Sequence, residues 1–68
     1  MRVIRIGDRV RIRDYTASFF HGVAPYSCGT VVGVTHMRGG QYIRIVIDDG
    51  PEIGWVDALG VDRIEANE

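Results

Sequence analysis

The chain has 68 residues, with 8 basic and 9 acidic side chains and a net charge of −1. This length predicts a single domain over residues 1–68 and excludes a large core, because so short a chain buries only about 60% of its unfolded surface. The balanced charge provides no overall attraction to nucleic acid or to an anionic membrane, so neither is an expected partner.

Cysteine usage and the apolar pattern predict a cytoplasmic protein. Cys28 is the single cysteine, so no disulfide can form within the chain, as is usual in a reducing compartment. No run approaches the ~20 apolar residues of a membrane span. Two arginines interrupt residues 1–6, which therefore do not resemble a targeting segment.

The first half of the chain predicts one strand and one long loop. Residues 9–13 alternate between arginine and aliphatic residues, as in a strand with one buried face. Residues 14–28 show neither strand nor helix periodicity, and Gly22 and Pro25 interrupt them, so we expect a long loop with one helical turn at 17–20. Loops this long in a small domain are more often functional than not.

A β-hairpin is the strongest signal in the sequence. Residues 29–34 and 42–47 are rich in β-branched residues, and the segment 37–40 between them carries a Gly-Gly turn signal. In the second run isoleucines alternate with other residues, so the hairpin has one apolar face. Because a two-stranded hairpin is not stable alone, the other strands must fold over it.

Short elements complete the second half. A turn at 48–51 leads to a fourth strand at 53–56, and residues 57–60 are typical of one 3₁₀ turn. A fifth strand follows at 61–64, and residues 65–68 form a polar tail.

These elements predict an all-β fold: a five-stranded SH3-like barrel with a long first loop and one 3₁₀ turn before the last strand. We expect the first strand to pair with the last, which would close the barrel and remove its exposed edges. The predicted core consists of Val10, Ile12, Val31, Val34, Ile43, Ile45, Ile47, Leu59, Val61 and Ile64.

Several segments carry a resemblance to a known family. They are residues 7–11 (Gly-Asp-Arg-Val-Arg), residues 29–34 (Gly-Thr-Val-Val-Gly-Val), Tyr42 and residues 61–64 (Val-Asp-Arg-Ile). This pattern resembles the type II dihydrofolate reductases, the plasmid-borne enzymes that resist trimethoprim. Those proteins are SH3-like barrels that assemble as homotetramers around one active pore, so the resemblance implies this scaffold and raises the expectation of a homo-oligomer.

The catalytic motif of that family is not carried over. Its fourth strand has Val-Gln-Ile-Tyr, which lines the pore and holds folate and the nicotinamide cofactor. Ile53, Gly54, Trp55 and Val56 stand at the matching positions, so glycine replaces the glutamine and valine the tyrosine. We therefore expect no cofactor, and keep an NADPH-dependent reductase with altered pore residues as an alternative.

Residues 8–34 also resemble two docking barrels. These are the photosystem I accessory subunit that docks ferredoxin and the C-terminal barrel of the nitrile hydratase β chain. Both share the Gly-Asp-basic-Val-Arg opening, a long loop with aromatic residues and a Gly-x-Val second strand. In both the barrel docks or assembles and does not catalyse, which implies the same role here.

Aromatic side chains are concentrated in the long loop, and the fourth strand adds a tryptophan. In SH3-like folds this loop flanks the peptide groove, so these residues could form a docking surface. Alternatively, Phe19 and Phe20 plug one open end of the barrel. The candidate binding residues are Tyr15, Phe19, Phe20, His21, Tyr26 and Trp55.

Outward arginines on neighbouring strands are candidate anion contacts. They could bind phosphates or nucleic acid. The alternative, favoured by the net charge, is a solvated face whose arginines pair with Asp14, Asp48 or Glu52. The candidate anion contacts are Arg9, Arg11, Arg13 and Arg44.

The chain offers one candidate segment for self-association and no motif with metal-ligand spacing. His21, Cys28 and His36 lack the spacing of a metal site, so we expect no metal. Residues 53–56 are a candidate self-association or pore segment, because Gly54 would let another backbone approach closely. Alternatively, the tryptophan of this strand simply covers the barrel.

The sequence therefore predicts a small non-enzymatic binding or assembly module. It would dock a protein partner, or a second copy of itself, through the loop 14–28 and the strand 53–56. The type II reductase-like enzyme and a nucleic-acid-binding small barrel remain the alternatives.

Overall fold

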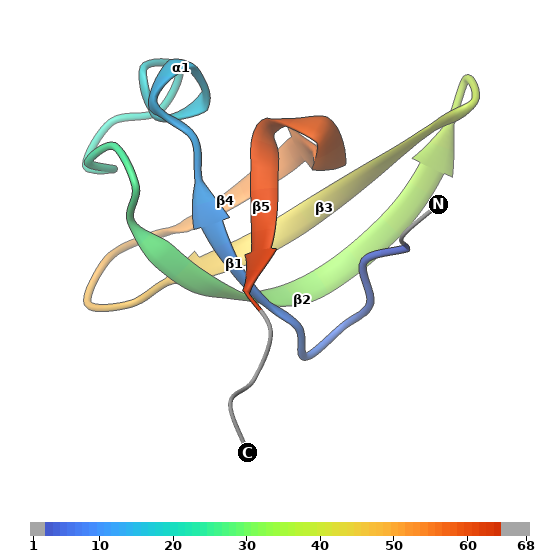
Figure 1. Ribbon diagram of the computed structural model, residues 1–68, viewed down its shortest axis with the longest axis horizontal. Coiled ribbons are helices and arrows are strands. Elements are labelled where there is room, and N and C mark those ends of the chain that lie inside the picture. Colours follow the sequence, from blue (N-terminus) through green and yellow to red (C-terminus); the bar gives the residue numbers. More distant parts are fainter. Residues whose placement is uncertain (1–2, 65–68) are drawn as a thin grey trace.

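The computed structural model describes residues 3–64, so the predicted polar tail at 65–68 lies outside the described residues. The elements, in chain order, are β1 (Arg9–Ile12), α1 (Asp14–Ala17), β2 (Cys28–Met37), β3 (Gly40–Ile47), β4 (Glu52–Asp57), the 3₁₀ helix η1 (Ala58–Gly60) and β5 (Val61–Ile64) (Figure 1). Neither helix within residues 3–64 has the length and apolar character needed to cross a membrane.

The strands form one bent antiparallel sheet in the order β4-β3-β2-β1-β5. The predicted all-β class, with five strands, a long first loop and one 3₁₀ turn before the last strand, is confirmed. β1 pairs with β5, with Arg9 opposite Ile64 and Ile12 opposite Val61. The sheet is not closed into a barrel, however, and the expectation that this pairing would remove the edges is wrong. The chain passes from β4 to β5 through η1, and these two strands remain the edges of the sheet.

Two irregularities bend the sheet around its core. The register of β2 on β3 shifts between Val31 and Gly33, and that of β3 on β4 shifts between Ile43 and Ile45. Such register shifts are typical of β-bulges, which bend a strand and increase its twist. The expected turn of the central hairpin is confirmed, and it contains Arg38 and Gly39 with φ of 51° and 78°.

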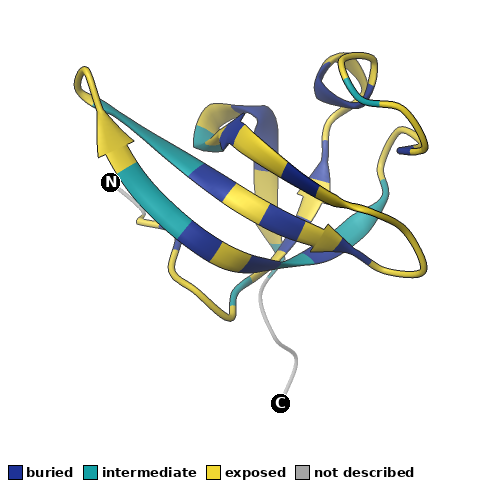
Figure 2. Cartoon of the chain, turned by 180° about the vertical axis from the view of Figure 1, so that it is seen from behind, coloured by how far each residue is buried: buried dark blue, intermediate teal, exposed yellow. Residues whose placement is uncertain are grey.

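The core lies on the concave face of the bent sheet, and buried and exposed residues alternate along β1 and β3 (Figure 2). Most predicted core residues are buried, although Val34 and Ile64 are only partly so. The prediction that Leu59 belongs to the core is wrong, because this residue is 78% exposed. Buried apolar residues that the sequence analysis left out of its core are Ile4, Ala17, Val23, Ile53 and Val56.

The long loop has more structure than its sequence indicates. Its helical turn spans Asp14–Ala17 rather than the predicted 17–20. Thr16 and Ala17 face the core, so the turn forms where two consecutive side chains can be buried. The end of the loop is fixed to β1, since the backbone N–H of Tyr26 donates to the carbonyl of Ile12 over 2.9 Å.

Candidate functional site

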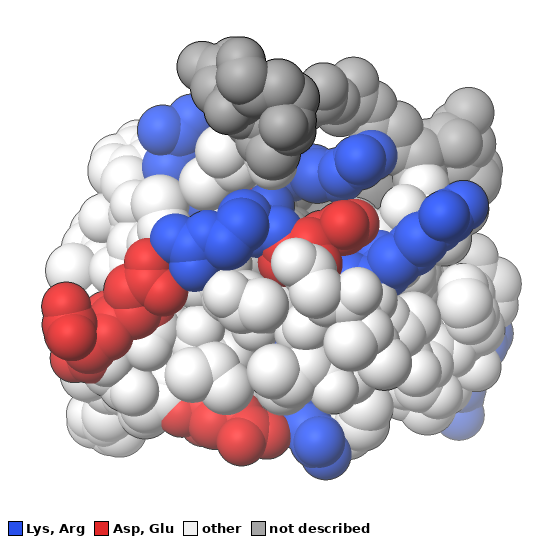
Figure 3. Space-filling model, turned by 90° about the horizontal axis from the view of Figure 1, so that it is seen from below, with Lys and Arg blue, Asp and Glu red and all other residues white. Residues whose placement is uncertain are grey.

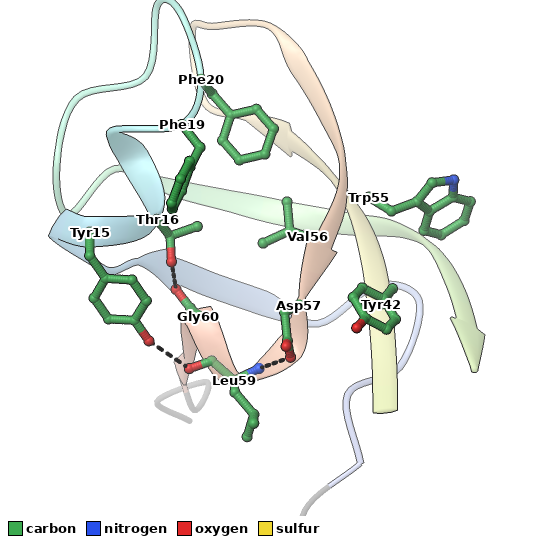
Figure 4. Close-up of a pocket in the computed structure, with 10 residues that line it drawn as sticks. All are labelled: Tyr15, Thr16, Phe19, Phe20, Tyr42, Trp55, Val56, Asp57, Leu59 and Gly60. Carbon is green, nitrogen blue, oxygen red and sulfur yellow. Dashed lines mark hydrogen bonds between the residues drawn. The ribbon is translucent and has the colours of Figure 1, made fainter. Parts of the chain in front are cut away.

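A pocket of about 420 Å³ opens between α1, the segment that follows it, the end of β4 and η1. Aromatic rings form much of its wall, and they come from the long loop, β3 and β4 (Figure 4). The structure thus brings together most of the predicted aromatic docking residues. The lining residues are Tyr15, Thr16, Phe19, Phe20, Tyr42, Trp55, Val56, Asp57, Leu59 and Gly60.

Two hydrogen bonds hold α1 against η1 and so fix one wall of the pocket. The buried hydroxyl of Thr16 donates to the carbonyl of Gly60 over 2.9 Å, and the Tyr15 hydroxyl donates to the carbonyl of Leu59 over 3.2 Å (Figure 4). A β-carbon at position 60 would collide with the Thr16 hydroxyl. Glycine there lets the two elements approach closely enough to bond.

Asp57 shapes the other side of the pocket. Its Oδ1 accepts a hydrogen bond from the backbone N–H of Leu59 over 2.9 Å and so caps η1. This cap and the Thr16–Gly60 bond leave Gly60 buried and the Leu59 side chain in solvent at the rim. Asp57 is the only charged side chain among the described residues that line the pocket.

Trp55 lies at the margin of the pocket, on the outer face of the sheet. Its side chain is 45% exposed and points away from the phenylalanines (Figure 4). The guanidinium carbon of Arg44 lies 5.4 Å from the centroid of its ring, within cation–π range. The Nε of Arg44 also pairs with Glu52 over 2.8 Å.

The predicted self-association segment is used within its own chain. Ile53 and Val56 are buried in the core. A β-carbon at Gly54 would collide with the side chain of Arg44 and lie 3.3 Å from its Cα. The close approach expected at Gly54 is therefore made by β3 of the same chain, so Gly54 itself gives no support for a second copy.

Most of the candidate anion contacts are paired with carboxylates. Arg9 binds Asp48 through two hydrogen bonds of 2.8 and 2.5 Å, and Arg13 binds Asp62 over 2.6 Å. Hydrogen bonds from these arginines lower the pKa of each carboxyl group. Arg11 is exposed and has no ion pair within residues 3–64.

Figure 3 shows the molecule from below, where basic and acidic side chains lie next to one another. With Arg44 held by Glu52, these pairs favour the interpretation of a solvated face. Of the predicted partners, Asp48 and Glu52 are used, whereas Arg13 binds Asp62 and not Asp14.

The remaining sequence candidates lie outside the aromatic pocket. His21 is exposed, and Tyr26 is 62% exposed and does not line it. His36 lines a second hollow, of about 850 Å³, which shares Tyr15, Asp57 and Leu59 with the pocket. The described part of the chain holds no group of three histidine, cysteine or acidic residues that could bind a metal ion.

Five lining residues are not among the candidates predicted from the sequence: Thr16, Tyr42, Asp57, Leu59 and Gly60. One signal was available, because an aspartate at the start of a predicted 3₁₀ turn is typical of a cap whose side chain is fixed near the turn. Comparison of the chain with protein-family models, curated proteins and solved structures finds no match.

Proposed function

We propose that this protein is a small, non-enzymatic binding module that docks a segment of another protein in the aromatic pocket. The observation that carries the proposal is the exposure of large apolar side chains around a hollow. Phe19 is 79% exposed on one side and Leu59 78% exposed on the other. Exposed rings beside a concave surface are typical of sites that bury them against a partner.

The fixed geometry of the wall supports the same proposal. Hydrogen bonds from Thr16 and Tyr15 hold α1 and η1 together in the free protein. A surface whose backbone is already in place loses less conformational entropy when a partner binds. The pocket therefore requires little rearrangement to accept an extended segment.

The chemistry of the lining residues argues against catalysis. Among the described lining side chains the titratable groups are the Asp57 carboxylate and the phenols of Tyr15 and Tyr42. This set contains neither a nucleophile beside a general base nor a pair of carboxylates. We expect purified protein to show no oxidation of NADPH when dihydrofolate is added, and turnover that depends on Trp55 would contradict the proposal.

A second copy of the chain is the alternative occupant, and the charges of β4 disfavour its simplest arrangement. A symmetric antiparallel pairing along the free edge of β4 would place Glu52 of one copy opposite Asp57 of the other. Like charges directly opposite each other destabilise a strand pair, and the pairing of Glu52 with Arg44 reduces this repulsion. We therefore propose a different protein as the partner, and expect light scattering to give a mass near the 7.6 kDa of one chain.

Selection from a library of random peptides displayed on phage tests the proposed site. We expect enriched peptides whose affinity falls about tenfold or more with Phe19→Ala or Leu59→Ala, as at residues that dominate an interface. Tyr26→Ala is the matched control, because it removes an exposed ring of the same loop outside the pocket. No enrichment, or peptides that bind all three variants equally, would refute the site. A dimer mass that Leu59→Ala abolishes would identify a second copy as the occupant.

A further inference from the structure

We propose that the segment docked in the aromatic pocket presents a single basic side chain, an arginine or a lysine, to the aromatic rings and Asp57. This inference rests on the proposed function and specifies the chemistry of the partner. It follows from the charge of the pocket, from an unused acceptor and from the nature of its walls.

The pocket is negative overall. Asp57 is the one charged side chain that lines it within the described residues. Arg44 lies over the ring of Trp55, and Arg13 lines the neighbouring hollow together with Tyr15, but each arginine is held by an acid. Arg13 pairs with Asp62 over 2.6 Å, and Arg44 pairs with Glu52 over 2.8 Å. These cations are neutralised, which leaves the charge of Asp57 for a ligand.

Asp57 retains an acceptor for that ligand. Its Oδ1 accepts the N–H of Leu59, whereas its Oδ2 has no hydrogen-bond partner within residues 3–64. The residue is exposed, so a ligand can reach it. An ionised carboxylate only accepts hydrogen bonds, and its strongest donors are guanidinium and ammonium groups.

The rings favour the same kind of group. The face of an aromatic ring carries partial negative charge and attracts cations within about 6 Å. Figure 4 shows the rings of Tyr15, Phe19 and Tyr42 and the carboxylate of Asp57 around the same hollow. An acidic side chain would be repelled by both the carboxylate and the ring faces, and a purely apolar one would leave Asp57 without a partner.

The size of the pocket sets how much of the ligand enters it. A volume of about 420 Å³ is near the lower end of the ~300–1,000 Å³ typical of ligand pockets. It therefore suits one long side chain rather than a folded surface. The neighbouring hollow shares Tyr15, Asp57 and Leu59 with the pocket, so the rest of the segment can continue past Leu59.

A titration with capped tripeptides tests the inference directly. The probes are Ac-Ala-Arg-Ala-NH₂ and its lysine, norleucine and glutamate analogues, added to labelled protein and followed by NMR at low salt. We expect the basic peptides to shift the backbone amide resonances of Asp57 and Leu59. The norleucine analogue should bind about tenfold more weakly, and the glutamate analogue should cause no saturable shift.

Asp57→Asn removes the charge and keeps a good capping residue for η1. It should weaken binding of the arginine peptide about tenfold while leaving the norleucine peptide unchanged. Asp49→Asn is the matched control, because it makes the same change in net charge in an exposed turn outside the pocket. An equal loss with Asp49→Asn would reveal only a long-range charge effect and would overturn the inference.

The result also separates this inference from the proposed function. If selected peptides depend on Phe19 and Leu59 but lack basic residues and ignore Asp57→Asn, the partner chemistry is wrong and the docking site stands. If neither the selected peptides nor the tripeptides bind, the proposed function fails and the inference fails with it.

Discussion

Leu59 and Val56 offer a direct test of the packing that positions the pocket. Both are apolar, and they lie close together in sequence, yet Leu59 is 78% exposed and Val56 only 3%. Truncation to alanine should therefore lower the free energy of unfolding strongly at Val56 and hardly at all at Leu59. Val56→Ala removes two buried carbons worth about 0.8 kcal/mol each and leaves a cavity, so we expect a loss of about 2–3 kcal/mol in the free energy of unfolding. Leu59→Ala should change it by less than about 0.5 kcal/mol.

Circular dichroism measures the free energy of unfolding of both variants in urea, and their Tm on heating. A domain of this size shifts its Tm by about 4–8 °C per kcal/mol, so Val56→Ala should melt well below wild type. The m-value should stay constant, since neither change alters the surface exposed on unfolding by much. A loss above about 1 kcal/mol for Leu59→Ala would refute the reasoning. It would show that Leu59 is packed in solution, as the sequence pattern predicted.

Three further predictions concern a buried hydrogen bond, the turn of the central hairpin and two ion pairs. Thr16→Val deletes the hydroxyl bonded to Gly60 and should lower the free energy of unfolding by about 1 kcal/mol; a variant as stable as wild type in urea would contradict this. Arg38→Asn should raise the free energy of unfolding by about 0.5–1 kcal/mol, because asparagine adopts a positive φ, here 51° directly before Gly39, more readily than arginine. An unchanged or lower Tm would contradict this prediction. The pKa values of Asp48 and Asp62 are lowered by hydrogen bonds from arginines. The stability from these pairs is therefore present above the unfolded pKa of about 3.9 and lost as pH falls through the folded value. Acid titration should show a shallower fall in Tm for Asp48→Asn and Asp62→Asn, and identical profiles would exclude the pairs as its cause.

The strands were predictable because their signals are local. Alternation in 9–13 and 42–47, and the glycines between the hairpin runs, specify strands and turns without reference to the rest of the chain. The direction of Leu59 was not predictable in this way. It depends on the Asp57 cap and on the bond between Thr16 and Gly60, which are 44 residues apart in sequence.

The candidate site was likewise predictable where its signals are local in sequence, and not where tertiary contacts decide. The concentration of aromatic residues in the loop could be recognised from composition, and Tyr15, Phe19 and Phe20 do line the pocket. Their neighbours Tyr26 and His21 could not be separated from them, because the path of the loop is set by tertiary contacts. The N–H of Tyr26 bonds to β1, and its ring lies outside the pocket.

The pocket and the open sheet have a common structural origin. Val56 and Asp57, at the end of the edge strand β4, contribute to the pocket, and η1 then carries the chain to the other edge strand, β5. If β4 and β5 were paired along their length, η1 would have no gap to cross. Its exposed leucine could not then stand opposite Phe19 of the long loop. Beyond the ladder of β1 with β5, α1 is held to η1 by the backbone bond from Arg13 to Gly60 and by the side-chain hydrogen bonds of Tyr15 and Thr16. The rings of Tyr15 and Phe19 are exposed there, and they give a small domain an apolar surface that its core does not require.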